Sequence, residues 1–73
     1  MIEVLYIKEG DMVLAREELQ RGELGSLPAE RDMVILGDHG KFSVSSRSYT
    51  SSSDGAQLKL ESVEIQVEGP IYG

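Results

Sequence analysis

Hydrophobic and polar residues alternate along several short runs of the chain, and a period of two is typical of β-strands. Residues 2–8 (IEVLYIK) are rich in β-branched and aromatic side chains. The turn signal Glu9-Gly10-Asp11 follows them, and the apolar run resumes over residues 12–15. Two such runs around a tight turn predict a β-hairpin at the start of the chain.

The middle of the chain predicts two further strands. Residues 32–36 (DMVIL) form the most apolar run and therefore predict a central strand. Residues 37–40 (GDHG) are a hairpin turn signal, and residues 41–49 alternate with Phe42 and Val44 on one face. The serine-rich residues 50–55 predict a second turn, because Asp-Gly at its end favours a positive φ.

The last apolar segment, residues 57–67, contains a change of phase. Leu58 and Leu60 fall on even positions, whereas the apolar residues at 63, 65 and 67 fall on odd ones. A slip of one residue sends every later side chain to the other face of a strand. We therefore predict a β-bulge, or a break between two strands, near Glu61–Ser62. The strand should end at Pro70, which lacks a backbone donor.

Residues 16–31 do not fit this pattern and predict a long, bent or partly helical excursion. The rest of the chain reads as about five strands that follow one another in a meander. The predicted fold is therefore mostly β: a single domain over residues 1–73, formed by a small curved antiparallel sheet or an SH3-like partly open barrel, with one loop or short helical excursion at 16–31.

The composition limits what such a domain can do. A chain of 73 residues buries little core, and domains of this size often gain stability from a disulfide, a metal or a partner. There is no cysteine and only one histidine, so we expect no cofactor and no metal site. No apolar run is long enough to span a membrane, and the N-terminus has no signal-peptide pattern, which predicts a cytoplasmic protein.

The charge is negative and unevenly distributed. The net charge is −6, and eleven of the thirteen acidic residues lie outside residues 33–57. Long-range repulsion from phosphates argues against direct nucleic-acid binding and favours basic protein surfaces as partners. Residues 39–55 carry eight serine and threonine hydroxyls with Lys41 and Arg47, but two cations are few for a nucleic-acid interface.

Motifs for catalysis are missing from the sequence. His39 adjoins Asp38 in a turn flanked by glycines, but no nucleophile motif accompanies the pair. The acidic residues lack the spacing of a calcium loop, and the glycines lack that of a phosphate loop. We therefore predict a protein that binds a partner and is not an enzyme.

Candidate contact residues are concentrated in the first part of the chain. Aromatic and arginine side chains dominate binding energies at interfaces, and acidic side chains would face a basic partner. Tyrosine and leucine here could equally belong to the thin core of so small a domain. The predicted partner-binding residues are Tyr6, Arg16, Glu17, Glu18, Leu19, Arg21 and Leu24, with Leu27 as a further anchor.

The whole-chain character, beginning MIEVLYIKEGD, resembles small regulators that lytic phages encode against bacterial RNA polymerase, such as one from a phage of the rice blight bacterium. The resemblance implies a monomer in the host cytoplasm that contacts the largest polymerase subunits near the RNA exit channel. It further implies inhibition of initiation and suppression of termination. Two alternatives are an acidic, nucleic-acid-mimicking inhibitor of a host defence nuclease and a virion assembly module.

Overall fold

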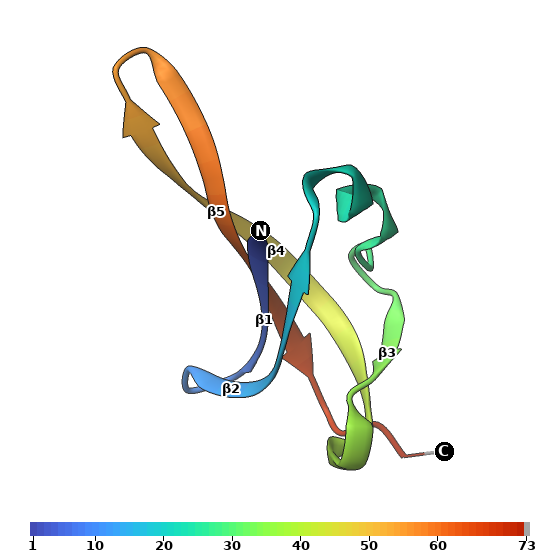
Figure 1. Ribbon diagram of the computed structural model, residues 1–73. Helices are drawn as coiled ribbons and strands as arrows, with labels where there is room; N and C mark the ends of the chain where they lie inside the picture. Colours follow the sequence, from blue (N-terminus) through green and yellow to red (C-terminus); the bar gives the residue numbers. More distant parts are fainter. Residues whose placement is uncertain (73) are drawn as a thin grey trace.

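The computed structural model describes residues 1–72 as one curled five-stranded sheet with the strand order β2-β1-β5-β4-β3 (Figure 1). The strands are β1 (Ile2–Lys8), β2 (Met12–Leu19), β3 (Met33–Ile35), β4 (Lys41–Asp54) and β5 (Gln57–Glu68). Two short 3-10 helices, η1 (Arg21–Ser26) and η2 (Gly37–His39), flank β3 in the chain. The sheet forms half of a barrel, which confirms the predicted mostly-β, partly open fold.

One pairing departs from the predicted antiparallel meander. β1 pairs with β5 in parallel, whereas the pairs β1–β2, β3–β4 and β4–β5 are antiparallel. The sheet is therefore mixed. β1 and the second half of β5 have the largest numbers of buried residues among the strands, and pairing them places both inside the sheet, where each is flanked on both sides.

The hydrophobic core fills the concave face of the sheet. Val4 of β1 lies opposite Val63 of β5, and Val44 of β4 lies opposite Val67. Paired residues share a face, so these side chains pack together with Ile65 and Phe42, all at most 2% exposed. Leu27 and Leu36, from the two connections that flank β3, complete the cluster.

Two elements of the first half differ from the sequence prediction. β2 continues to Leu19, so the excursion begins only after residues 16–19, which are strand. The predicted central strand is wrong: β3 comprises only Met33–Ile35 and lies at the edge of the sheet. Val34 faces Phe42 and packs on the core, whereas Met33 and Ile35 are 47% and 76% exposed. This apolar run is therefore an edge strand: the face that carries Val34 packs on the core, and the face that carries Met33 and Ile35 is exposed to solvent.

The β4–β5 hairpin agrees with the predicted phase change and corrects the predicted turn. Ser62 lies opposite Thr50 and Leu60 opposite Ser51, so Glu61 is the extra residue of a β-bulge, as predicted. The bulge returns the leucines at 58 and 60 to the concave face of the sheet. Residues 50–54 are strand instead of turn, because a two-residue turn at Gly55-Ala56, with Gly55 at φ 65, is sufficient to reverse the chain.

The turn end of the β4–β5 hairpin projects beyond the core and makes the molecule elongated, with a longest dimension of 48 Å (Figure 1). At the other end of the sheet the chain leaves β5 after Glu68, as the proline predicted. There the backbone N–H of Ile71 donates to the carbonyl of Lys41 over 2.7 Å. In the described part of the chain no helix has the length and apolar character to cross a membrane.

Candidate functional site

The open side of the half-barrel contains a groove of about 600 Å³. It lies between the two terminal strands of the sheet, with β2 on one side and β3 with η2 on the other. The groove is lined by Tyr6, Leu14, Ala15, Arg16, Glu17 and residues 34–39. Its size falls within the roughly 300–1,000 Å³ that is typical of ligand sites.

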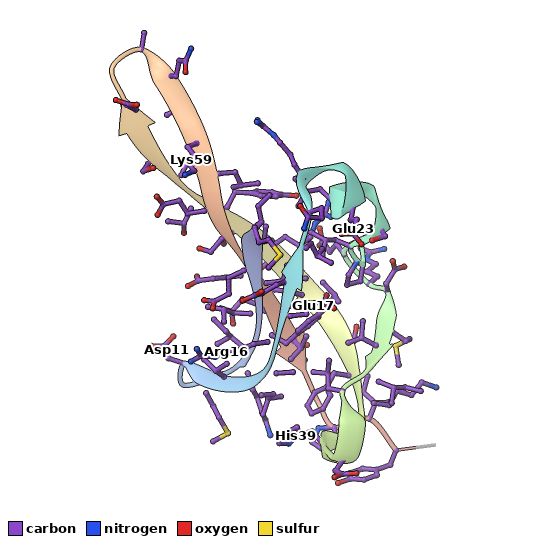
Figure 2. All side chains as sticks on the ribbon, in the orientation of Figure 1. Asp11, Arg16, Glu17, Glu23, His39 and Lys59 are labelled. Atoms are coloured by element: carbon purple, nitrogen blue, oxygen red, sulfur yellow. The ribbon has the colours of Figure 1, made fainter. Side chains whose placement is uncertain are left out.

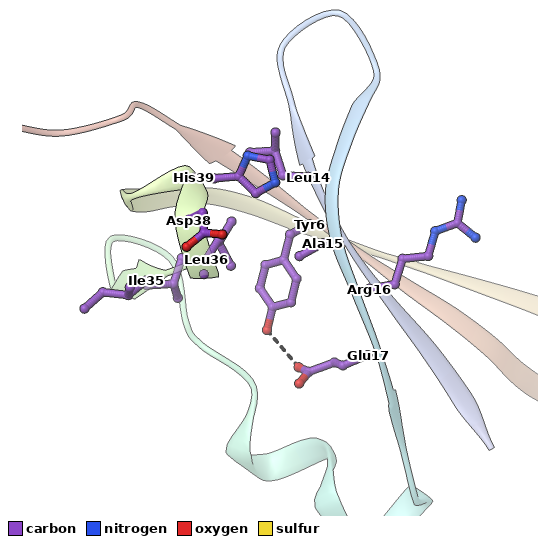
Figure 3. A pocket seen from close by; sticks show the side chains of 11 residues that line it. Tyr6, Leu14, Ala15, Arg16, Glu17, Ile35, Leu36, Asp38 and His39 are labelled. Atoms are coloured by element: carbon purple, nitrogen blue, oxygen red, sulfur yellow. Dashed lines mark hydrogen bonds between the residues drawn. The ribbon is translucent and has the colours of Figure 1, made fainter.

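The floor of the groove is apolar because the alternation of β2 directs small and apolar residues inward. Tyr6 of β1 lies opposite Ala15, and both face the core. The ladder then shifts register, since Ile7 pairs with Val13 and leaves Leu14 as an extra, bulged residue. Leu14 and His39 both line the groove (Figure 3). Leu36, which is 8% exposed, closes the floor from the other side.

Tyr6 and Glu17 form the polar contact within the groove. The Tyr6 hydroxyl donates to Oε1 of Glu17 over 2.8 Å, and Figure 3 shows the two side chains pointing toward each other. Burial, followed by the hydrogen bond and the negative charge of Glu17, raises the pKa of Tyr6 to about 12. The phenol is therefore neutral at physiological pH, and the carboxylate of Glu17 keeps a second oxygen for another donor.

The predicted contact residues do not form one surface. Arg16 and Glu18 pair with Leu5 and Glu3, so they lie on the convex face, whereas Glu17 and Leu19 lie on the concave face. Figure 3 shows Arg16 projecting away from Tyr6 and Glu17. This separation follows from the strand conformation of residues 16–19, which were predicted to be part of the loop or helical excursion.

The remaining predicted residues divide between the core and η1. Tyr6 is 8% exposed and belongs to the core, and Leu19 and Leu24 pack partly buried against it. Leu27 is buried in the same cluster. Arg21 is exposed at the start of η1. It lines a second, smaller pocket of about 200 Å³ with Met1, Ile2, Gln20, Lys59 and Leu60.

Two hydrogen bonds fix the start of the η1 turn, beside the second pocket. The backbone N–H of Gln20 donates to the Glu23 carboxylate over 2.9 Å, and the Glu23 N–H donates back to the Gln20 carbonyl. The two bonds satisfy donors at the start of the 3-10 helix. The positions of Glu17 and Glu23 relative to η1 can be followed in Figure 2.

Several groove residues were not predicted as contacts. In the sequence, Leu14, Ala15, Val34 and Leu36 belong to apolar runs, and Asp38 and His39 belong to a predicted turn. Their common position depends on the closing of the sheet around the core, which no local pattern encodes. Among residues 1–72 no three His, Cys, Asp or Glu side chains gather as they would around a metal ion.

Comparisons with protein-family models, with curated proteins and with solved structures found no match to this chain.

Proposed function

We propose that this protein is a phage-type regulator that binds bacterial RNA polymerase by protein contact, inhibits initiation and suppresses termination without catalysing a reaction. The observation that carries the proposal is the groove between two unpaired sheet edges. Sheet edges present backbone donors and acceptors that readily pair with another chain. The net charge of −6 adds attraction for a basic protein surface.

The chemistry of the groove is that of a binding site. An apolar floor with a few placed polar groups is the usual composition of such sites. Tyr6 donates to Glu17, and its raised pKa, about 12, holds its proton on the phenol. His39 and Asp38 lie at the rim on the exposed η2 turn. The resemblance in whole-chain character supplies the choice of polymerase as the partner.

The direct test uses purified RNA polymerase from the rice blight bacterium. We expect the protein to co-elute with the polymerase, to reduce promoter-dependent initiation and to increase read-through at a terminator in transcription assays. The acidic contact is tested with the double variant Glu17→Lys, Glu18→Lys, which should bind more weakly. The matched control, Glu61→Lys with Glu68→Lys, makes the same charge change on β5.

Two results would count against the proposal. If the protein and the polymerase elute separately at low salt, the partner is wrong. If the Glu17/Glu18 variant binds as tightly as the control, residues 16–31 are not the electrostatic contact.

The competing proposal is an acidic inhibitor that mimics nucleic acid. Such a mimic needs rows of carboxylates on one surface, whereas Glu17 and Glu18 lie on opposite faces of β2 with Arg16 beside them. Competition by DNA for the captured partner discriminates the two proposals, because only a mimic should be displaced. Sedimentation of the isolated protein tests the expected monomer against a virion assembly module.

A further inference from the structure

The two strands that border the groove differ greatly in the edge they offer. β2 has eight residues, and β3 has three. Both are terminal strands, so neither has a neighbour on its outer side within the sheet. β2 therefore presents the longer free row of backbone donors and acceptors, and it does so directly beside the apolar floor.

Side chains along β2 set a spacing for anything that pairs with it. Ala15 and Glu17 are two residues apart and share the concave face, since they lie opposite Tyr6 and Val4 of β1. Ala15 is small and leaves room above the floor that Tyr6 and Leu36 form. Glu17 follows it with a carboxylate whose Oε1 is held by Tyr6.

The charges around the groove favour a cationic group beside Glu17. Glu17 stands on the β2 side and Asp38 on the η2 side, whereas the guanidinium of Arg16 projects away from them (Figure 3). His39 lines the groove from the η2 side as well. A carboxylate next to an apolar surface discriminates strongly between cationic and anionic partners.

We infer that the groove binds an extended segment of the partner protein that adds to β2 as a sixth strand. An apolar side chain of this segment lies over Ala15, and a lysine or arginine two residues along pairs with Glu17. The inference deepens the proposed function and rests on it for the view that the occupant is a protein. The spacing and the charge come from β2 itself.

The test uses synthetic peptides of the length of β2, eight residues. In the first peptide every second residue is threonine, and the positions between the threonines are valine and lysine by turns. In the second, glutamate replaces lysine. Two further peptides have the same sequence as the lysine peptide, but every second backbone nitrogen is methylated. One of them blocks the N–H groups along one edge of the peptide strand, and the other blocks those along the opposite edge. Affinity is measured by fluorescence anisotropy, and the site by amide chemical shifts of the labelled full-length protein.

We expect the lysine peptide to bind, with the largest shifts at the β2 amides around Ala15 and Glu17. The glutamate peptide should bind at least about tenfold more weakly. One of the two methylated peptides should lose binding, since a strand added to a single edge uses only one row of its own N–H groups.

The matched variants are Glu17→Gln and Glu9→Gln, which remove the same charge from the groove and from the first turn. The amide oxygen of Glu17→Gln still accepts from Tyr6, so the fold is retained. We expect this variant to reduce the preference for lysine over glutamate by about tenfold and Glu9→Gln to leave it unchanged.

The inference is overturned by equal affinity for the lysine and glutamate peptides, by equal binding of both methylated peptides, or by shifts centred on β3 or on the convex face. Absence of any shift at about 1 mM peptide, the weak limit of specific binding, also overturns it. A concentration-dependent dimer that occupies β2 would assign the groove to a second copy instead. Peptide binding without polymerase binding would reject the proposed function and leave the strand-addition site standing.

Discussion

The two ends of the β4–β5 ribbon share a backbone ladder but differ in what their side chains contact. In the body of the protein, Val44 pairs with Val67, and both are at most 2% exposed. In the arm, which we define as residues 51–60, Ser53 pairs with Leu58, and Leu58 is 73% exposed. Backbone pairing therefore extends through both regions, with two register shifts, whereas the fully buried side chains are confined to the body.

This difference indicates which interactions stabilise the fold. A two-stranded hairpin is marginal by itself in water, and a third strand or a packed face is needed for independent stability. The body has β1 on the other side of β5 and the core on its concave face. The arm has no third strand, and of its apolar residues only Leu60 at its base packs against the core, so its order depends on the body to which it is attached.

The largest effect should come from the body. Ile65→Ala removes most of a fully buried side chain in the central strand β5. We expect a loss of about 3 kcal/mol in the free energy of unfolding, since the substitution removes transfer energy and leaves a cavity. Urea denaturation followed by circular dichroism measures it. A loss no greater than that of the arm variant below would contradict the assignment of the core.

The next effect distinguishes the two regions in the unaltered protein. Amide hydrogens of the arm should exchange through local opening at a free energy at least about 1.4 kcal/mol below that of β1 and central β5, a tenfold faster exchange. Hydrogen exchange followed by NMR resolves the two sets. Equal protection in both would mean that the arm and the body unfold as one unit.

A smaller, pH-dependent effect concerns the groove side of the body. The pKa of Tyr6 is raised from 10 to about 12, so the folded state favours the neutral phenol. The stabilisation is complete below pH 10 and is lost as the pH rises through 12. Tyr6→Phe should abolish this alkaline loss of stability. At neutral pH it should lower the free energy of unfolding by about 1 kcal/mol, because it removes the hydrogen bond to Glu17. The difference in ultraviolet titration between the two proteins isolates the Tyr6 transition.

The smallest effect should come from the arm. Leu58→Ala removes an exposed side chain, and we expect the free energy of unfolding to change by less than about 0.5 kcal/mol. It serves as the control for Ile65→Ala in the same denaturation series. A loss comparable to that of the core variant would show that the arm packs on the body in solution.

Local pattern predicted much of the sheet and little of the groove. The hairpin turns at residues 9–11 and 37–40, and the bulge at Glu61, were readable because glycine and a phase change act over a few residues. The edge position of β3 could not be predicted, since the hydrophobicity of a strand shows that its side chains can be buried but not which strands lie next to it. The strand conformation of residues 16–19 was missed because their polar side chains line an edge with one neighbour.

The sequence by itself determined the β-rich class, the positions of the turns at 9–11 and 37–40, the phase of β5 and the acidic character of the chain, because each of these depends on residue type and spacing along a few positions. Only the tertiary structure decided that β1 pairs with β5 in parallel and that β2 and β3 become the free edges with the groove between them. Those features arise when strands distant in the sequence curl around a shared core, and the groove exists because five strands close only half of the barrel.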